Sequence, residues 1–330
     1  MKLQAPVAGK RGHSRRQWLR AGLAGAGGWV VGGLLSSCAA DLDHPRVARP
    51  AGIPGLLVPL RTLTGGRIIL TSSPTGMPIA QGGFGAMTQF VFPVAVAADS
   101  FNLYVADAGV RRLYRYDPLV DAMAVVPGVD VTPQTRLALG RDLSIYVATP
   151  GVAPLRRYDR GGRLLMEIDP QLGAARYDDV AVDRDSGTIF GLDRSFGRLE
   201  EINPLGRAAT LVSDEILSQS PTAIAWDEHR IYLGGAHCAC VVALTPHTRE
   251  RAVLATGLRH PSAMAARDGW LVVLDTLERK LSIFHRGEAR GAASVDALGL
   301  FDPQGLALAG GMLYVADAGG RRVAIFRLYR

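Results

Sequence analysis

From about residue 93 onward, short apolar runs alternate with turns rich in glycine, aspartate and proline. The run at 103–107, LYVAD, recurs unchanged at 313–317 near the end of the chain. Related runs occupy 145–149, 189–193, 231–235 and 271–275. Consecutive copies are 42, 44, 42, 40 and 42 residues apart, so the chain contains six repeats of about 42 residues.

Each repeat combines three apolar segments at nearly constant spacing. The LYVAD-like run is preceded by a short alternating run. Another apolar run begins ten residues after the start of the LYVAD-like run. The repeat cores lie near 93–117, 135–159, 177–203, 221–245, 261–285 and 303–327. Runs of this length between turn residues predict strands. We find no 3.6-residue periodicity over ten or more residues after residue 38, which excludes a helical solenoid. The pattern predicts an all-β, six-bladed β-propeller.

The last repeat ends with its third strand, and an incomplete blade would leave an unpaired strand edge. Residues 67–72, RIILTS, form a β-rich run that belongs to no complete repeat. We therefore predict that this N-terminal segment closes the last blade, and that the propeller spans 67–330. Residues 38–66, which contain several prolines and little periodicity, are expected to form a tether.

The sixth repeat carries PQGLA at 303–307, YVAD at 314–317 and RVAIF at 322–326. This series of motifs resembles the repeat unit of the NHL-repeat family, and the resemblance covers about residues 90–330. It implies a six-bladed β-propeller. It leaves the function open, because one fold serves many functions.

The N-terminal segment resembles a bacterial export signal. Residues 14–19, SRRQWL, resemble the twin-arginine motif through Arg15 and Arg16. Residues 21–35 are weakly apolar, glycine-rich and too short for a stable membrane-spanning helix. Residues 35–38, LSSC, resemble a lipobox. This resemblance implies that the signal peptide 1–37 is removed and that Cys38 carries acyl chains.

Acyl chains on Cys38 would hold the exported protein at a membrane without a spanning helix. Ala39 follows this cysteine, and by analogy with Gram-negative lipoproteins the lack of aspartate there favours the periplasmic side of the outer membrane. The alternative is an uncleaved apolar anchor with a coincidental cysteine. We expect a single propeller chain, acting as a monomer with an envelope protein as partner.

The formal net charge of +7 does not indicate nucleic-acid binding. Residues 1–37 hold six basic residues and no acidic ones, so the rest of the chain carries 31 basic and 30 acidic residues. A nucleic-acid-binding domain needs a basic surface, and a nearly neutral mature protein offers no such signal. We therefore expect no nucleic-acid partner.

Four repeats place an aspartate at the end of the LYVAD-like run, with a basic residue five positions later. The pairs are Asp107 and Arg112, Asp193 and Arg198, Asp275 and Lys280, and Asp317 and Arg322. Repeats two and four lack both members of the pair. Because the aspartate and the basic residue are present together or absent together, we predict that they form an exposed ion pair that braces the hairpin. Such a pair contributes about 0.2–1 kcal/mol to stability.

Repeat three begins with Asp178 and Asp179, where most other repeats have small or apolar residues. In a propeller this position lies at the mouth of the central channel, where a carboxylate must be hydrated, paired or metal-bound. Either a hydrated mouth with a salt bridge to Arg136, or a ligand or divalent-cation site, fits the pattern. Thr222, Ser262 and Gln304 would share the rim.

A second candidate site is His237-Cys238-Ala239-Cys240, in the hairpin of repeat four. Export to an oxidising compartment favours a disulfide between Cys238 and Cys240. Free thiols remain an alternative, and so does a metal site formed by His237, Cys238 and Cys240 with His260 as a fourth ligand.

We find no nucleophile elbow, zinc-protease motif or phosphate-binding loop in the sequence. The first functional hypothesis is therefore a non-enzymatic binding or scaffold propeller at the cell envelope, with no certain cofactor. One alternative is an accessory protein of an exported redox system. Another is a metal-dependent enzyme that resembles the lactonase or lyase propellers, with its metal at the channel mouth.

Overall fold

The structure is a computed structural model that describes residues 52–68, 87–118, 121–169, 176–212 and 220–329. Arg15, Arg16 and Cys38 lie outside the described residues. The regular secondary structure of the described residues consists of β-strands. None of these residues belongs to a helix long and apolar enough to cross a membrane.

The described residues form six sheets, one for each sequence repeat, and we number these blades from one to six. Blade one contains β4 (Pro93–Ala98), β5 (Leu103–Asp107), β6 (Arg112–Asp117) and β7 (Ala122–Val126). Blade two contains β8 (Arg136–Leu139), β9 (Ile145–Thr149), β10 (Ala153–Tyr158) and β11 (Leu164–Ile168). Blade three contains β12 (Asp179–Val182), β13 (Ile189–Asp193), β14 (Arg198–Ile202) and β15 (Ala208–Val212).

The remaining blades repeat this antiparallel order. Blade four contains β16 (Pro221–Asp227), β17 (Arg230–Gly235), β18 (Cys240–Leu244) and β19 (Arg251–Thr256). Blade five contains β20 (Pro261–Arg267), β21 (Trp270–Asp275), β22 (Lys280–His285) and β23 (Glu288–Ser294). Blade six contains β24 (Pro303–Ala309), β25 (Met312–Asp317) and β26 (Arg322–Leu328). The chain is thus an all-β, six-bladed propeller, as predicted.

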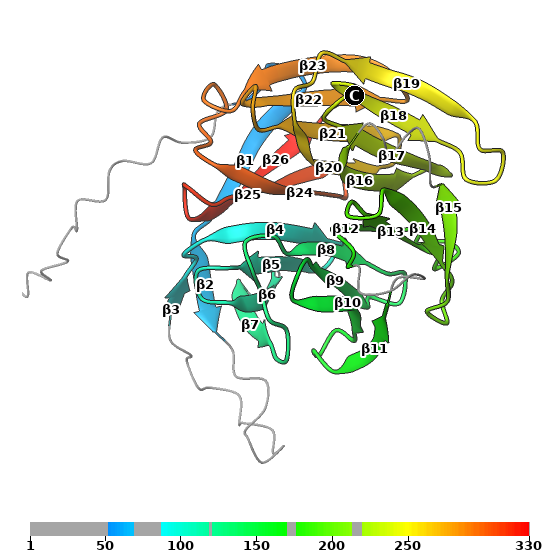
Figure 1. Ribbon diagram of the computed structural model, residues 1–330. Helices are drawn as coiled ribbons and strands as arrows, with labels where there is room; N and C mark the ends of the chain where they lie inside the picture. Colours follow the sequence, from blue (N-terminus) through cyan, green and yellow to red (C-terminus); the bar gives the residue numbers. More distant parts are fainter. Residues whose placement is uncertain (1–51, 69–86, 119–120, 170–175, 213–219, 330) are drawn as a thin grey trace, which may run out of the picture. The chain divides into compact units, whose positions relative to one another are not determined.

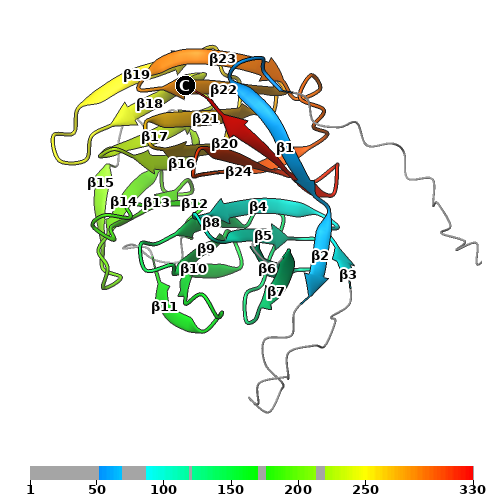
Figure 2. The ribbon, with the colours of Figure 1, turned by 180° about the vertical axis from the view of Figure 1, so that it is seen from behind.

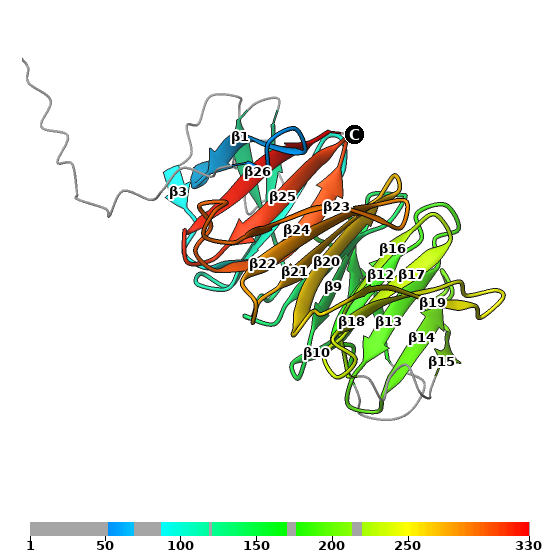
Figure 3. The same cartoon turned by 90° about the horizontal axis from the view of Figure 1, so that it is seen from above.

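The first strand of each blade lies innermost. Strands β4, β8, β12, β16, β20 and β24 contact one another in a closed ring, while each occupies one edge of its own sheet. Figure 1 shows these strands near the middle and the outer strands β11, β15, β19 and β23 at the periphery. Figure 3 shows the strands of blade five running side by side. The innermost strands therefore enclose the central channel.

The second strands of the blades are more deeply buried than the outer strands. The second strands β5, β9 and β13 are buried along their whole length, because both of their faces pack against neighbouring blades. The outer strand β23 alternates exposed and half-buried residues instead. Six apolar clusters fill the spaces between adjacent blades, so the core is a ring of interfaces and not one central mass.

An N-terminal strand closes blade six, but it is not the predicted one. Strand β1 (Leu57–Leu63) pairs antiparallel with β26, from Leu57 opposite Leu328 to Leu63 opposite Val323. Figure 2 shows the two strands side by side. This closure joins the two ends of the propeller and covers the edge that the third strand of blade six would expose. Residues 57–63 therefore belong to the propeller and not to the predicted tether.

The segment predicted to close blade six is used elsewhere. Strand β2 (Gly65–Ile68) pairs in parallel with β7 of blade one and antiparallel with β3 (Met87–Gln89). Arg67 and Ile68 lie opposite Ala122 and Met123 of blade one. Residues 69–72 lie outside the described residues. The prediction was wrong because β1 is buried only at its two ends. The residues between them are mostly exposed, so the strand has no alternating apolar pattern by which it could be recognised.

Candidate functional site

The two ends of the propeller carry different turns. We call the end at which each innermost strand begins the upper face; it also carries the turns between second and third strands. We call the opposite end the lower face. Contacts between neighbouring blades join strand starts to strand starts, as in the hydrogen bond of 2.5 Å from Thr222 Oγ1 in β16 to Pro261 O in β20. Others join strand ends to strand ends, as in the hydrogen bond of 3.1 Å from Arg184 Nε, just after β12, to Leu139 O at the end of β8.

Three of the four repeated aspartates, Asp107, Asp275 and Asp317, are buried clamps for the backbone. Asp107 accepts hydrogen bonds from the backbone N–H groups of Val91 and Phe92 at 2.7 and 2.9 Å, and from that of Gly109 at 2.9 Å. Asp275 and Asp317 accept from the matching connections of blades five and six. Each clamp therefore ties the end of the second strand to the segment that leads into its own blade.

The predicted ion-pair brace forms in two of the four blades. Arg198 lies 2.9 Å from Asp193, and Arg322 lies 2.8 Å from Asp317. Both pairs are almost completely buried, which corrects the expectation of exposed pairs. Arg112 and Lys280 are exposed, and within the described residues neither forms an ion pair.

Asp178 and Asp179 lie at the start of β12, the innermost strand of blade three, and have different partners. Asp178 pairs with Arg194 at 3.0 Å and accepts the backbone N–H of the same residue at 2.8 Å. Asp179 is 7% exposed and accepts the backbone N–H groups of Val180 and Ile224, both at 2.9 Å. Burial raises the pKa of Asp179, while the charge of Arg136 and both amides oppose that shift. Asp179 therefore ties blade three to blade four.

The other predicted rim residues also contact the protein itself. Thr222 Oγ1 donates to Pro261 O at 2.5 Å, and Ser262 Oγ lies 3.4 Å from Leu274 O. Gln304 Nε2 donates to Asp302 Oδ1 at 2.7 Å, and Arg136 Nη1 donates to Thr135 O at 3.1 Å. In the part of the chain that the structure describes, the buried Nδ1 of His260 has no hydrogen-bond partner.

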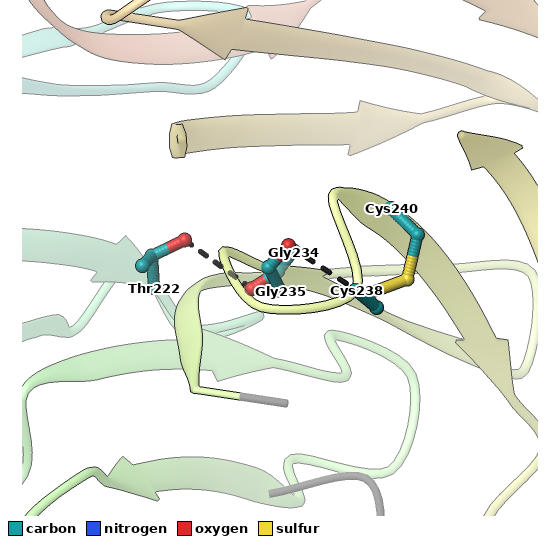
Figure 4. The surroundings of a disulfide bond; sticks show 5 residues. All are labelled: Thr222, Gly234, Gly235, Cys238 and Cys240. Carbon is teal, nitrogen blue, oxygen red and sulfur yellow. Dashed lines mark hydrogen bonds between the residues drawn. A yellow bond between two sulfur atoms is a disulfide. The ribbon is translucent and has the colours of Figure 1, made fainter. Parts of the chain in front are cut away.

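Cys238 and Cys240 form a disulfide in the turn between β17 and β18, with their Cα atoms 5.0 Å apart. Figure 4 shows the cross-link at the end of this hairpin. His237 is exposed beside it, and its Nδ1 lies 2.9 Å from Ser220 Oγ. Because both sulfurs are used by the disulfide, they are not available as thiolate ligands. No group of three or more potential metal-ligating side chains occurs among the described residues.

The upper face carries a set of exposed apolar side chains that the sequence analysis missed. They come from turns and connections of five of the six blades: Val91, Val110, Val152, Phe196, Leu277 and Phe301. Among the described residues, the turns of the lower face expose two large apolar side chains, Phe101 and Leu205, and Tyr329, which follows β26 there, is also exposed. A large apolar residue inside a predicted turn was the available sequence signal, because turns favour glycine and small polar residues.

Two of these side chains rest on the buried braces. The guanidinium of Arg198 lies 5.1 Å from the ring centroid of Phe196, and that of Arg322 lies 5.5 Å from the ring of Phe301. Cation–π attraction at this range holds each ring against a side chain that is itself fixed by an ion pair. Phe196 is nevertheless 57% exposed and Phe301 44% exposed. The upper face thus presents two aromatic rings in fixed positions.

The channel opens at the lower face into a cavity of about 280 Å³. Arg184 lies at this mouth and donates to Leu139 O and Ala98 O, both at 3.1 Å, so it joins blade three to blades two and one. Burial lowers the pKa of Arg184 to about 10, and the charge of Arg267 contributes. The six innermost strands line the cavity with Val, Ala, Leu and Ile side chains and place charged groups at the rim.

No family model matches the sequence, and no curated protein matches it either. Solved structures share the fold. Virginiamycin B lyase from Staphylococcus aureus, as an inactive variant with quinupristin, has a TM-score of 0.57 at 11% identity, covering 83% of this chain and 98% of that chain. A gluconolactonase from Xanthomonas campestris has a TM-score of 0.55 at 16% identity, covering 87% and 100%. A chain of a nidogen/laminin complex has a TM-score of 0.57 at 17% identity, and the match covers 69% of this chain and 90% of that chain. These likenesses show a propeller fold shared by enzymes and by a protein of a protein–protein complex.

Proposed function

We propose that this protein is a binding propeller that docks a protein partner on its upper face. The observation that carries the proposal is the set of exposed apolar side chains on that face. Exposed apolar residues gathered on one surface mark interaction sites more often than scattered ones do. The lower-face turns in the described part of the chain expose only Phe101 and Leu205.

The two braced aromatic rings make this face suitable for tight docking. Binding energy concentrates in a few aromatic and arginine residues, and ordering a flexible side chain costs free energy on binding. Phe196 and Phe301 are already ordered by Arg198 and Arg322, so a partner does not need to immobilise them. We expect these two residues to dominate the affinity.

A metal-dependent enzyme of the lactonase or lyase type is supported less well. The carboxylates predicted to hold a metal already have partners: Asp178 forms a salt bridge to Arg194, and Asp179 accepts hydrogen bonds from backbone amides. A catalytic role would require these groups to leave their present partners. The two enzymes with this fold are too distant in sequence to transfer an activity to this chain.

We further propose that the propeller is exported and acts at a membrane as a single chain. The support is the resemblance of Arg15 and Arg16 to a twin-arginine motif, and of residues 35–38 to a lipobox with Cys38 as the lipidated residue. Membership in the NHL-repeat family is a proposal of the same kind, based on the motifs at 303–326. The natural partner would then be another protein of the cell envelope.

Comparison of affinity-tagged variants from the native envelope tests the docking proposal. The wild type, a Phe196→Ser/Phe301→Ser variant and a Phe101→Ser control are purified under the same conditions. We expect the double variant to lose a co-purifying protein by at least about tenfold, while the control retains it. Equal recovery in all three, at unchanged thermal stability, would remove the upper face as the docking site.

A further inference from the structure

The disulfide of blade four cross-links a turn whose conformation does not depend on the cross-link. Ala239, between the two cysteines, has a positive φ of 50°. The matching residues of other blades have φ values between 48° and 58° without any disulfide: Arg111, Gly197, Arg279 and Arg321. Five copies of the same turn thus reach this backbone conformation, and four of them contain no cysteine.

The hydrogen bonding of the turn leads to the same conclusion. Ala239 N donates to Ala236 O at 3.3 Å in the cross-linked turn. The matching bonds, from Gly197 N to Arg194 O and from Arg321 N to Ala318 O, measure 3.3 and 3.1 Å. The disulfide also closes a loop of only three residues, and the stabilisation from restricting the unfolded chain grows with loop length. It is therefore a weak structural staple.

The two cysteine residues differ in their access to solvent. Cys238 occupies the turn position that in blades one to three holds the exposed residues Val110, Val152 and Phe196, and it is itself half-buried. Cys240 is 3% exposed and lies on β18 opposite Gly235. An incoming nucleophile therefore reaches the sulfur of Cys238 first.

The surroundings of Cys238 also suit the reduced state. Its Sγ lies 3.5 Å from Gly235 O, as Figure 4 shows. In the disulfide this sulfur carries no hydrogen, so the contact cannot be a hydrogen bond. In the reduced protein the S–H group would find that carbonyl oxygen in place as an acceptor. Reduction then replaces a covalent bond with a hydrogen bond and leaves the hairpin as it is.

From these observations we infer that Cys238–Cys240 is a redox-active pair that exchanges with external thiols. A donor thiolate attacks Cys238 Sγ, forms a mixed disulfide and releases Cys240 as a thiolate, which takes up a proton. A second donor thiolate attacks the donor sulfur of that mixed disulfide. Cys238 leaves as a thiolate and is protonated, and the two donor thiols are oxidised to one disulfide. This inference is independent of partner docking.

Redox titration of the full-length protein tests the inference. The protein is equilibrated in buffers of reduced and oxidised glutathione, and in parallel with a thioredoxin-type dithiol protein. Free thiols are then alkylated, and peptide mass spectrometry distinguishes Cys238 and Cys240 from Cys38. We expect reversible reduction of the pair without denaturant, and an unchanged far-UV circular dichroism spectrum and thermal midpoint. Reaction with glutathione or with the dithiol protein supports the inference, and the faster donor identifies the source of electrons.

Two single variants locate the attacked sulfur. With oxidised glutathione, Cys240→Ser is expected to form the mixed disulfide on Cys238 at least about tenfold faster than Cys238→Ser forms it on Cys240. The inference is overturned if the wild-type pair reacts with neither donor until denaturant is added. It is also overturned if reduction unfolds the protein, because the disulfide would then be a structural staple.

Discussion

At the residue scale, the repeated aspartates are stabilising elements of the fold and not a catalytic ring. Asp107, Asp275 and Asp317 are fully buried, and each accepts backbone N–H groups from the segment entering its blade. The sequence pattern identified the correct residues. The predicted basic partner pairs with the aspartate in blades three and six only. The backbone N–H partners were missed because backbone amides leave no trace in a sequence, whereas a basic side chain five positions away does.

Replacing one clamp tests this role. Asp107→Ala leaves the buried N–H groups of Val91, Phe92 and Gly109 without their acceptor. We expect the free energy of unfolding, measured by urea denaturation, to fall by about 2–4 kcal/mol. Asp296→Ala, which removes an exposed ion pair with Arg279, is the control and should cost at most about 1 kcal/mol. Similar small losses in both variants would contradict the clamp.

Asp227 at the lower face should make stability depend on pH. Burial raises the pKa of Asp227 to about 6, and the charge of Glu228 adds to this, although the N–H groups of Asp268 and Gly269 oppose it. In the unfolded chain the side chain of Asp227 ionises near pH 4. Between about pH 4 and 6 the folded state therefore binds more protons than the unfolded state, and stability falls as the pH rises.

The Asp227→Asn variant isolates this effect. Asparagine does not titrate. The stability of the variant relative to the wild type should therefore rise between pH 4 and pH 6.5 and then level off. The change with pH is the relevant quantity, because the amide also replaces one accepting oxygen at every pH. Thermal midpoints of both proteins across this range provide the measurement. A constant difference would mean that the pKa of Asp227 is not raised in the folded protein.

At the scale of the element, the regular repeat made the first three strands of each blade predictable. The fixed spacing located β4, β5 and β6 and their five sets of counterparts, because these strands supply most of the apolar residues that pack between the blades. The outer strands were not located, since solvent on one side permits varied sequences. Strand β1 was missed for the same reason: only Leu57 and Leu63, at its two ends, are buried.

The closing strand makes a testable contribution to stability. Leu57 is fully buried in the cluster between blades five and six, whereas Leu60 on the same strand is 48% exposed. Leu57→Ala should lower the free energy of unfolding by about 2–4 kcal/mol, because it leaves a cavity in the core. Leu60→Ala should change it by less than about 0.5 kcal/mol. If residues 57–63 were a tether, both variants would unfold like the wild type.

At the scale of the whole molecule, the sequence predicted the fold better than the site. Six copies of one unit specify a propeller and, through closure, the use of an N-terminal strand. The proposed binding face is made of residues that break the repeat, such as Phe196 in a turn, and that they share one face appears only when the blades are assembled. Asp178 and Asp179 do break the repeat, yet in the structure they contact other parts of the propeller.

The resulting molecule has two unlike ends. The upper face presents apolar turns, two braced aromatic rings and a disulfide at the turn of blade four. The lower face holds the open end of the channel, with Arg184 joining three blades. A rigid ring of blades keeps the upper-face residues at fixed spacing, which is the property that a docking surface needs.

Site-specific photo-crosslinking tests the docking face most directly. A photoreactive amino acid replaces Phe196, Leu277 or Phe301 on the upper face, or Phe101 on the lower face, and the full chain is irradiated in intact cells. The account predicts that the three upper-face positions cross-link to the same protein and that position 101 does not. Cross-linking from position 101 alone, or equally from all four positions, would contradict it.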